Sequence, residues 1–203
     1  MLENCYFTIK EKEKIHMAIP CSEITRAITA YSNRFSDSDI QSLQPLLEAI
    51  TLSHDITSRT CFPGHVTTSA VIMDDKRRVL YIRHKTLKAW LLPGGHCEET
   101  DHSLIEAGLR EVFEETGIPP EKLQPILPKN VPIDIDLHDI PDNPVKGEPP
   151  HWHADFRFAF RLESFAKVTI QEEEVTGHAW LTLEQMPMRR LADRLRNLVE
   201  TPG

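Results

Sequence analysis

A dense group of carboxylates marks residues 93–118, whose sequence is PGGHCEETDHSLIEAGLREVFEETGI. Glu111 and Glu115 are four residues apart, and Glu111 and Glu114 are three apart, so on a helix these side chains would share one face at about 5–6 Å. Like charges at this spacing repel one another, and the helix macrodipole disfavours anions near a helix C-terminus. A hard divalent cation would explain the group, because Mg²⁺ binds carboxylate oxygens together with substrate phosphates.

Two interpretations of this segment remain open from the residues alone. In the first, the acidic face is solvated and Arg110 forms an ordinary helical pair with Glu114. In the second, the carboxylates converge on a metal ion. The glycines Gly94 and Gly95, just before the helix, favour the second interpretation, because a glycine turn lets backbone groups approach a ligand closely.

The segment REVFEETGI, residues 110–118, resembles the second half of the Nudix box, the signature of the Nudix hydrolase family. The first half is a variant. Five residues separate Gly95 from Asp101, which stands where the box has glutamate, and one extra residue precedes Arg110. The similarity extends over roughly residues 64–188 and includes the segment EEVTGHAWLTLEQMP after the box.

This resemblance implies hydrolysis of a pyrophosphate bond in a nucleoside diphosphate derivative or a related diphosphate, with Mg²⁺ or Mn²⁺ as cofactor. It implies that Glu111 and Glu115 are the main metal ligands, with Glu114 close by and the Gly95 carbonyl as a further ligand. Arg110 would hold a carboxylate in place, either that of Asp101 or that of Glu114. The catalytic residues expected on this basis are Arg110, Glu111, Glu114, Glu115, Glu173 and Glu174.

Glu173 and Glu174 precede the last predicted strand, where many family members carry a glutamate that acts as general base or as a further metal ligand. A solvated acidic turn is an equal alternative for these two residues. The resemblance also leaves two other functions open. One is a nucleotide-binding module without catalysis, and the other is a diphosphate isomerase that would use Cys97. The complete set of box glutamates favours the hydrolase.

A second group of polar residues lies on the clearest strand of the chain, HWHADFRFAFRLE at residues 151–163. His151, His153 and Arg157 alternate with apolar residues and therefore share one strand face. We expect this face, with His96 beside the glycine turn, to bind substrate, because imidazole can bond phosphate and arginine can bind it with two bonds. Asp134, Asp136, His138 and Asp155 accompany them. Zn²⁺ binding would require three or four of these residues to converge, and half-exposed strand positions are the remaining alternative.

The composition limits the possible partners of the chain. It has 203 residues, of which 40% are hydrophobic, so one medium-sized domain with a real core is expected. The net charge of −8 argues against extended nucleic-acid binding, which requires a basic surface. No apolar run approaches the ~20 residues of a membrane span. The four cysteines have no CxxC spacing, which favours a reduced, cytoplasmic protein; a homodimer is left open.

The elements that position these residues follow from hydrophobic periodicity. Helices are predicted within residues 22–53, with Ser22 as N-cap and Pro45 as a kink or boundary, and at 102–116 and 184–200. Strands are predicted at 65–73, 77–84, 89–92, 133–140, 151–163 and 177–183. With the resemblance, this pattern predicts an α+β protein, a Nudix-type α/β/α sandwich with a mixed β-sheet. A helical extension would occupy residues 1–60 and the Nudix domain residues 61–203.

Overall fold

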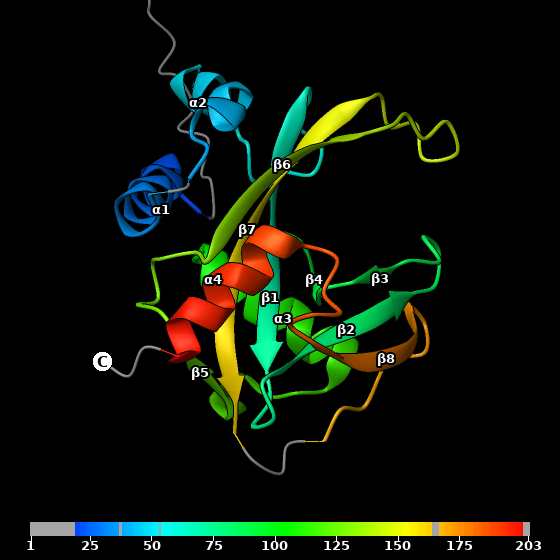
Figure 1. The fold of residues 1–203 in the computed structure, drawn as a ribbon. Helices are drawn as coiled ribbons and strands as arrows, with labels where there is room; N and C mark the ends of the chain where they lie inside the picture. The colour runs from blue at the N-terminus through cyan, green and yellow to red at the C-terminus, as the bar shows by residue number, and fades with distance from the viewer. Residues whose placement is uncertain (1–18, 37, 53, 164–166, 201–203) are drawn as a thin grey trace, which may run out of the picture.

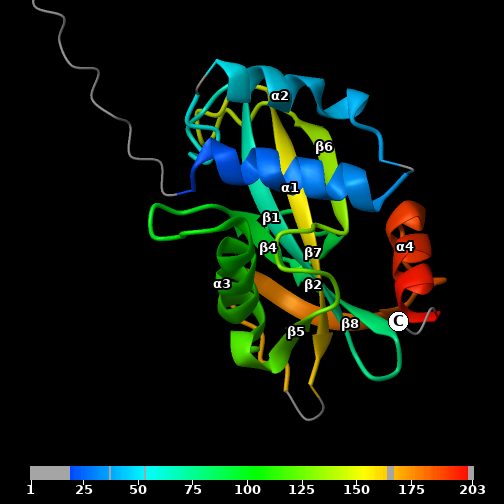
Figure 2. The same ribbon diagram turned by 90° about the vertical axis from the view of Figure 1, so that its left-hand side faces the viewer.

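A mixed β-sheet lies between helix α3 on one face and helix α4 on the other (Figures 1 and 2). The structure is a computed structural model that describes residues 19–36, 38–52, 54–163 and 167–200. The helices are α1 (Cys21–Arg34), α2 (Gln44–Thr51), α3 (Leu104–Thr116) and α4 (Arg189–Glu200), with short 3-10 turns at Gln41–Leu43 and Pro120–Lys122. The strands are β1 (Gly64–Met73), β2 (Arg78–His84), β3 (Trp90–Leu91), β4 (Gly94–His96), β5 (Leu123–Pro125), β6 (Asp134–Ile140), β7 (His151–Leu162) and β8 (Val175–Thr182). This arrangement confirms the expected α+β sandwich.

The centre of the sheet is the parallel pair β1 and β7, which runs from Gly64 opposite Trp152 to Met73 opposite Arg161. All other strand pairs are antiparallel. On the side of β1 that faces away from β7, two strands pair with it. β4 pairs with the middle of β1, and β2 pairs with β1 at Met73. The register therefore places β4, with the predicted ligand Gly95, against the buried middle of the central strand.

Helix α3 ends at Thr116, as the sequence predicts, but it begins at Leu104 rather than at residue 102. The Ser103 side chain accepts a hydrogen bond from the Glu106 amide at the N-cap, and the helix stops at Gly117, whose φ of 64° lies in the left-handed region that favours glycine. At Gly108 the helix packs against β1, where a Cβ would lie 3.5 Å from the Thr68 hydroxyl oxygen, an ordinary contact distance. The polar residues of α3 are thereby held close to β4.

Helix α1 packs with the face that the sequence predicts, but it begins differently. Ile24, Ala27, Ile28 and Tyr31 are its buried residues. The predicted N-cap at Ser22 is wrong, because the helix begins at Cys21, after Pro20, and no side chain caps its first amides. A proline that precedes the helix fixes the entry of the chain instead.

Helix α2 shows why Pro45 matters. The periodicity of residues 38–53 predicts a buried face made of Ile40, Leu43, Leu47 and Ile50. In the structure Leu43 is buried as predicted. A new helix then starts at Gln44, with Pro45 in its first turn, and it buries Leu46 and Ala49 while Leu47 and Ile50 are only half-buried. The helix phase restarts at the proline, so the apolar face predicted for a continuous helix is displaced by one residue.

The two N-terminal helices are not detached from the sheet. Their buried side chains belong to the same hydrophobic core as those of β1 and β7. Glu23 on α1 accepts a hydrogen bond from the Leu104 amide at 2.8 Å, so α1 stabilises the N-terminus of α3. The predicted boundary at residue 60 stays a prediction; residues 1–18, with Cys5, and residues 201–203 lie outside the described part of the chain.

Two further differences concern short elements near the C-terminal half. Strand β5 is not predicted, because three residues beside prolines carry too little periodic signal. Helix α4 begins at Arg189 rather than at residue 184, since a turn closed by the Thr182 and Gln185 contacts precedes it. None of the described helices is long and apolar enough to cross a membrane.

A buried ionic network joins four elements around Asp134 of β6. Its carboxylate lies 2.9 Å from Arg157 of β7 and 2.8 Å from Arg194 of α4, and the Tyr31 hydroxyl of α1 donates to it at 3.4 Å. Arg190, also in α4, adds a contact at 2.9 Å. Because Asp134 and Arg194 are both buried, each charge depends on the other for compensation.

We expect Asp134→Ala to lower the free energy of unfolding by about 3–5 kcal/mol, because it leaves the buried guanidinium groups without their shared carboxylate. Urea denaturation followed by circular dichroism measures this change. The matched control is Asp139→Ala, an exposed residue of the same strand, which should change stability by less than about 0.5 kcal/mol. Equal losses for the two variants would contradict a central role for the network.

Candidate metal centre

The backbone of β4 contacts two carboxylates of α3. The Gly94 amide donates to Glu115 Oε2 at 2.9 Å, and a Cβ on Gly95 would lie 2.5 Å from Glu111 Oε1. The Glu115 residue is 4% exposed and the Glu111 side chain 15%. Glu114, by contrast, is 49% exposed at the rim of the group. The acidic face of α3 is therefore not a solvated surface.

Burial and mutual repulsion act strongly on the two inner carboxyl groups. Burial raises the pKa of Glu111 to about 7, although the neighbouring Arg110 opposes the shift. Burial likewise raises the pKa of Glu115 to about 8, against the hydrogen bond from Gly94, and the charges of Glu111 and Glu174 add to the rise. In the protein alone, the ionised forms of both groups are thus disfavoured.

These residues fit a hard divalent cation. Glu111 and Glu115 offer carboxylate oxygens at the contact surface between α3 and β4, and the absence of a Cβ at Gly95 leaves the strand backbone accessible to the same space. A cation there would favour the ionised carboxylates that burial disfavours. The structure thus brings together Gly95, Glu111 and Glu115, with Glu114 at the edge.

Arg110 organises the outer side of this group. It holds both oxygens of Asp101, each at 3.1 Å, and donates to Glu114 at 2.9 Å and Glu111 at 3.1 Å. A further bond, at 2.8 Å, reaches the carbonyl oxygen of His96. Burial disfavours the charged guanidinium, but the bond to Asp101 and the surrounding carboxylates raise the pKa of Arg110 above its ordinary value.

Arg110 therefore binds both of the carboxylates that the sequence offered as its alternative partners, Asp101 and Glu114. The inserted residue before Arg110 does not remove Asp101 from its reach, because a tight turn compensates for it. In this turn the Asp101 amide donates to the Glu98 carbonyl oxygen, and the Glu98 amide donates to Asp101 Oδ2. Asp101 is buried beside Arg110 and acts on the metal-binding face through it.

The loop before β8 approaches the same carboxylates. The Gln171 amide donates to the Glu115 carbonyl oxygen at 3.2 Å, which joins this loop to the end of α3. The charge of Glu174 raises the pKa of both Glu111 and Glu115, so Glu174 lies within electrostatic reach of them. Glu174 and Glu173 are both exposed, and a catalytic role for either stays a prediction.

The histidines expected to bind substrate come together, with one addition. His96 of β4 and His153 of β7 have ring centroids 5.1 Å apart, and His151 Nε2 lies 3.1 Å from His153 Nε2. His65 of β1 packs against all three rings at 4.6–5.1 Å. Sequence reasoning missed His65 because its place depends on the parallel register that sets it opposite His153.

Arg157 does not face an open phosphate site. Its three guanidinium nitrogens donate to Asp155, Asp134 and Asp136 at 2.8–2.9 Å, and the residue is buried. The expectation that Arg157 binds substrate is therefore corrected to a structural role. Spacing on β7 alone could not show this, because two of the carboxylates come from β6 through the strand register.

The structure does not favour His138 as a zinc ligand or Cys97 as a reactive cysteine. His138 Nδ1 lies 3.1 Å from Asp136 Oδ2, and this contact raises the pKa of His138. Its ring centroid is 5.9 Å from that of His153, so it lies at the margin of the histidine group. Cys97 is buried, and burial raises its thiol pKa to about 12, which does not suit an acid–base or nucleophilic cysteine.

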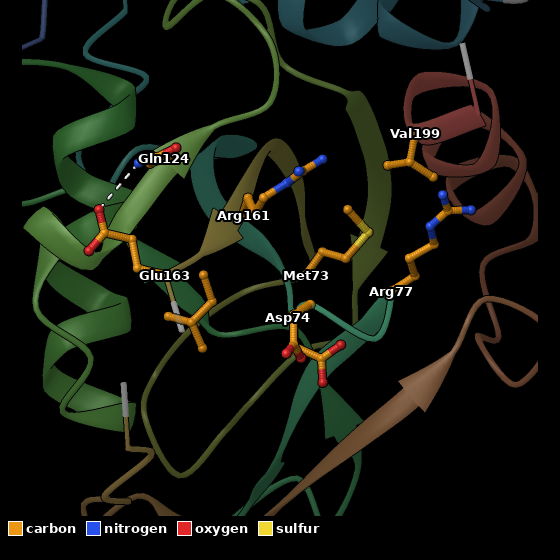
Figure 3. Close-up of a pocket in the computed structure, with 9 residues that line it drawn as sticks. Met73, Asp74, Arg77, Gln124, Arg161, Glu163 and Val199 are labelled. Atoms are coloured by element: carbon orange, nitrogen blue, oxygen red, sulfur yellow. Dashed lines mark hydrogen bonds between the residues drawn. The ribbon is translucent and has the colours of Figure 1, made fainter. Parts of the chain in front are cut away.

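A large cavity of about 730 Å³ lies away from these residues, at the end of β1 and β7 (Figure 3). Asp74, Arg161, Glu163 and Val199 are among its lining residues, and Gln124 donates to Glu163 at 3.2 Å across it. We place the site instead at β4 and α3, where buried carboxylates with raised pKa values converge.

Comparison with known proteins agrees with the geometry. The NUDIX domain model matches residues 63–201, more than half of the chain. A curated protein named "Probable DHNTP pyrophosphohydrolase", from Lactococcus lactis subsp. cremoris (strain MG1363), is 33% identical over 119 residues, which is 59% of this chain and 63% of that protein. An "Uncharacterized Nudix hydrolase NudL" from Enterobacter sp. (strain 638) is 35% identical over 107 residues, 46% of this chain and 55% of that protein.

Each of these matches spans less than two thirds of the relative's own length. Among solved structures, a NUDIX family hydrolase from Clostridium perfringens is 26% identical with a TM-score of 0.51, over 67% of this chain and 97% of that one. The matched family model, at residues 63–201, covers the sandwich and the candidate site and begins after helices α1 and α2.

We expect Gly95→Ala to fold but to bind Mg²⁺ at least about tenfold more weakly, because the new methyl group would displace the end of the flexible Glu111 side chain. Isothermal titration calorimetry with Mg²⁺ measures the change. Gly147→Ala is the control, since a Cβ there meets nothing within 4 Å. Because Gly147 has a φ of 68°, this variant places alanine in a strained left-handed conformation, but the new Cβ does not touch Glu111, so its Mg²⁺ affinity should stay unchanged. Unchanged Mg²⁺ affinity in a folded Gly95→Ala protein would contradict the close approach.

Proposed function

The chain belongs to the NUDIX family, and we propose that it is a pyrophosphohydrolase that cleaves a nucleoside diphosphate derivative or a related diphosphate with Mg²⁺ or Mn²⁺. The observation that carries this proposal is the pair of buried carboxyl groups, Glu111 and Glu115, held against the glycine backbone of β4. A binding surface for an organic ligand alone would not require two carboxyl groups whose charged forms are disfavoured.

The residues divide the work of such a reaction. Glu111 and Glu115 would hold the cation, with the Gly95 carbonyl and the exposed Glu114 beside them. When bound, a divalent cation stabilises charge on phosphate oxygens and activates water. Arg110 fixes Glu111 and Glu114 relative to strand β4, because it donates to both carboxylates and to the His96 carbonyl oxygen.

A proton acceptor for the attacking water is the least defined part of the site. Glu174 is our first candidate, because its charge acts on Glu111 and Glu115 and its side chain is exposed to solvent. Glu173 stays the second candidate. We place the substrate beside His96, His151 and His153, since the His96 backbone directly contacts Arg110.

The two rival functions predict different behaviour. A binding module would retain nucleotide affinity without turnover. A diphosphate isomerase would need a reactive cysteine, and the buried Cys97 thiol, with its pKa raised to about 12, is poorly suited to that role. Of the three, hydrolysis best uses the residues that the fold brings together.

The test is a panel of diphosphates and triphosphates incubated with the full chain and Mg²⁺ or Mn²⁺. The panel includes nucleoside triphosphates, dinucleoside polyphosphates, nucleotide sugars and DHNTP, because one relative carries that substrate in its name. Released phosphate is measured directly and after phosphatase treatment. We expect turnover of at least one compound and its loss with a chelator; binding without turnover across the panel, or chelator-resistant turnover, would contradict the proposal.

Asp101→Ala should lower kcat/KM less than Glu115→Gln. Asp101 acts through Arg110, and losses of such supporting contacts cost about 10–100-fold. Glu115 would contact the cation itself, so its loss removes transition-state stabilisation worth several kcal/mol, at about 1.4 kcal/mol per tenfold change in rate. Kinetics at saturating Mg²⁺, with circular dichroism as the folding control, compare the two. Equal losses would make Asp101 a direct ligand.

A further inference from the structure

Four histidine rings from three different strands form one compact group beside the carboxylate site. They are His65 of β1, His96 of β4, and His151 and His153 of β7. His65 contacts each of the others, with ring centroids 4.6 Å from His153 and 5.1 Å from both His96 and His151. Neighbouring positions of the sheet thus direct four imidazoles toward one place. These histidines are separate from the glutamates of the Nudix box.

His65 has a ring nitrogen without a partner. Its Nδ1 lies 3.2 Å from the Cys61 carbonyl oxygen. A carbonyl oxygen only accepts, so Nδ1 carries the proton and Nε2 keeps its lone pair. That Nε2 atom is buried and makes no hydrogen bond, and the residue is 1% exposed. A buried acceptor without a partner is costly, so this atom indicates a missing ligand.

His151 is oriented by the same logic. Its Nδ1 donates to the Pro149 carbonyl oxygen at 2.7 Å, which leaves the lone pair on Nε2. This atom accepts a hydrogen bond at 3.1 Å from His153 Nε2, so the contact orients the His153 ring and leaves the lone pair of His153 on Nδ1. Backbone carbonyls and a neighbouring ring therefore hold these imidazoles in place, as the supporting contacts of metal-binding histidines do.

His65, His96 and His153 each offer a ring nitrogen, and the three atoms lie within 4.8 Å of one another. Ligand nitrogens around a tetrahedral Zn²⁺ ion lie about 3.3 Å apart, given Zn–N bonds of about 2.0–2.1 Å. Small rotations of the rings would close the remaining gap. Three histidines with a fourth, open position are a known ligand set for Zn²⁺.

We propose that His65, His96 and His153 bind one divalent transition-metal ion of the Zn²⁺ class, at a site separate from the carboxylate centre, with His151 as the residue that positions His153. Imidazole ligands favour such ions, whereas Mg²⁺ prefers the carboxylates of α3. The two sites adjoin each other through β4, because His96 follows Gly95 and its carbonyl accepts from Arg110.

The charge of the ligand set indicates what the open position would take. Three neutral imidazoles leave the full charge of the ion uncompensated, so an anionic fourth ligand is favoured. A phosphate oxygen of a substrate bound at the neighbouring carboxylates has this chemistry, and this last step rests on the proposed function. The binding of the ion itself does not, and its test uses no activity.

The test is a titration of the chelator-stripped full chain with Co²⁺, whose visible absorption distinguishes tetrahedral from octahedral sites. We expect intense tetrahedral bands that saturate at one equivalent and are displaced by Zn²⁺. His96→Ala and His153→Ala should abolish the bands, and His151→Ala should weaken binding by about 10–100-fold. Glu115→Gln should leave the bands unchanged, as should His178→Ala, an exposed histidine of β8.

X-ray absorption of the Co²⁺ protein supplies a second measurement that needs no variant. Scattering from imidazole rings is expected, and a shell of oxygen atoms alone would overturn the proposal. Bands that survive both histidine variants, bands lost in Glu115→Gln, thiolate charge-transfer bands, or no tetrahedral binding would overturn it equally. Circular dichroism confirms that each variant is folded before its spectrum is compared.

Discussion

The close approach of helix α3 to strand β4 forms the candidate metal centre of this protein. Gly95 leaves no room for a side chain beside Glu111, and the Gly94 amide holds Glu115. This contact depends in turn on the pairing of β4 with the middle of β1, on which α3 packs through Gly108. The candidate metal centre therefore depends on the sheet register and on the two glycines of β4, as well as on the acidic residues of α3.

Charge is distributed in two contrasting ways on the sandwich. Around Asp134, three arginines surround one carboxylate, and Arg157 reaches two more, so that cations and anions neutralise each other within the fold. Beside β4 the balance is reversed: Arg110 alone serves a larger group of acids, and the two inner carboxyls keep raised pKa values. The first arrangement stabilises the structure, whereas the second holds carboxyl groups whose ionised forms a bound cation would favour.

The sequence predicted the parts of this protein that depend on local spacing. The C-terminal limit of α3 and the shared helix face of Glu111 and Glu115 follow from periodicity and from the box resemblance, whereas the helix begins two residues later than predicted. It could not predict that Arg157 is enclosed by carboxylates or that His65 joins His153, because both facts depend on registers between distant strands. The prediction of the buried face of α2 failed for a different reason. Pro45 starts a new helix, so one helical period does not describe residues on both sides of it.

The parallel pairing of β1 with β7 has a consequence for how the protein folds. Gly64 pairs with Trp152, so more than half of the domain must be present before the two central strands can join. Such distant contacts are slow to form, because the loop between them must first be closed. Strand β4 and helix α3, by contrast, are close together in the chain. During synthesis, the box can therefore assemble its local contacts early, whereas the four histidines meet only after β7 has left the ribosome.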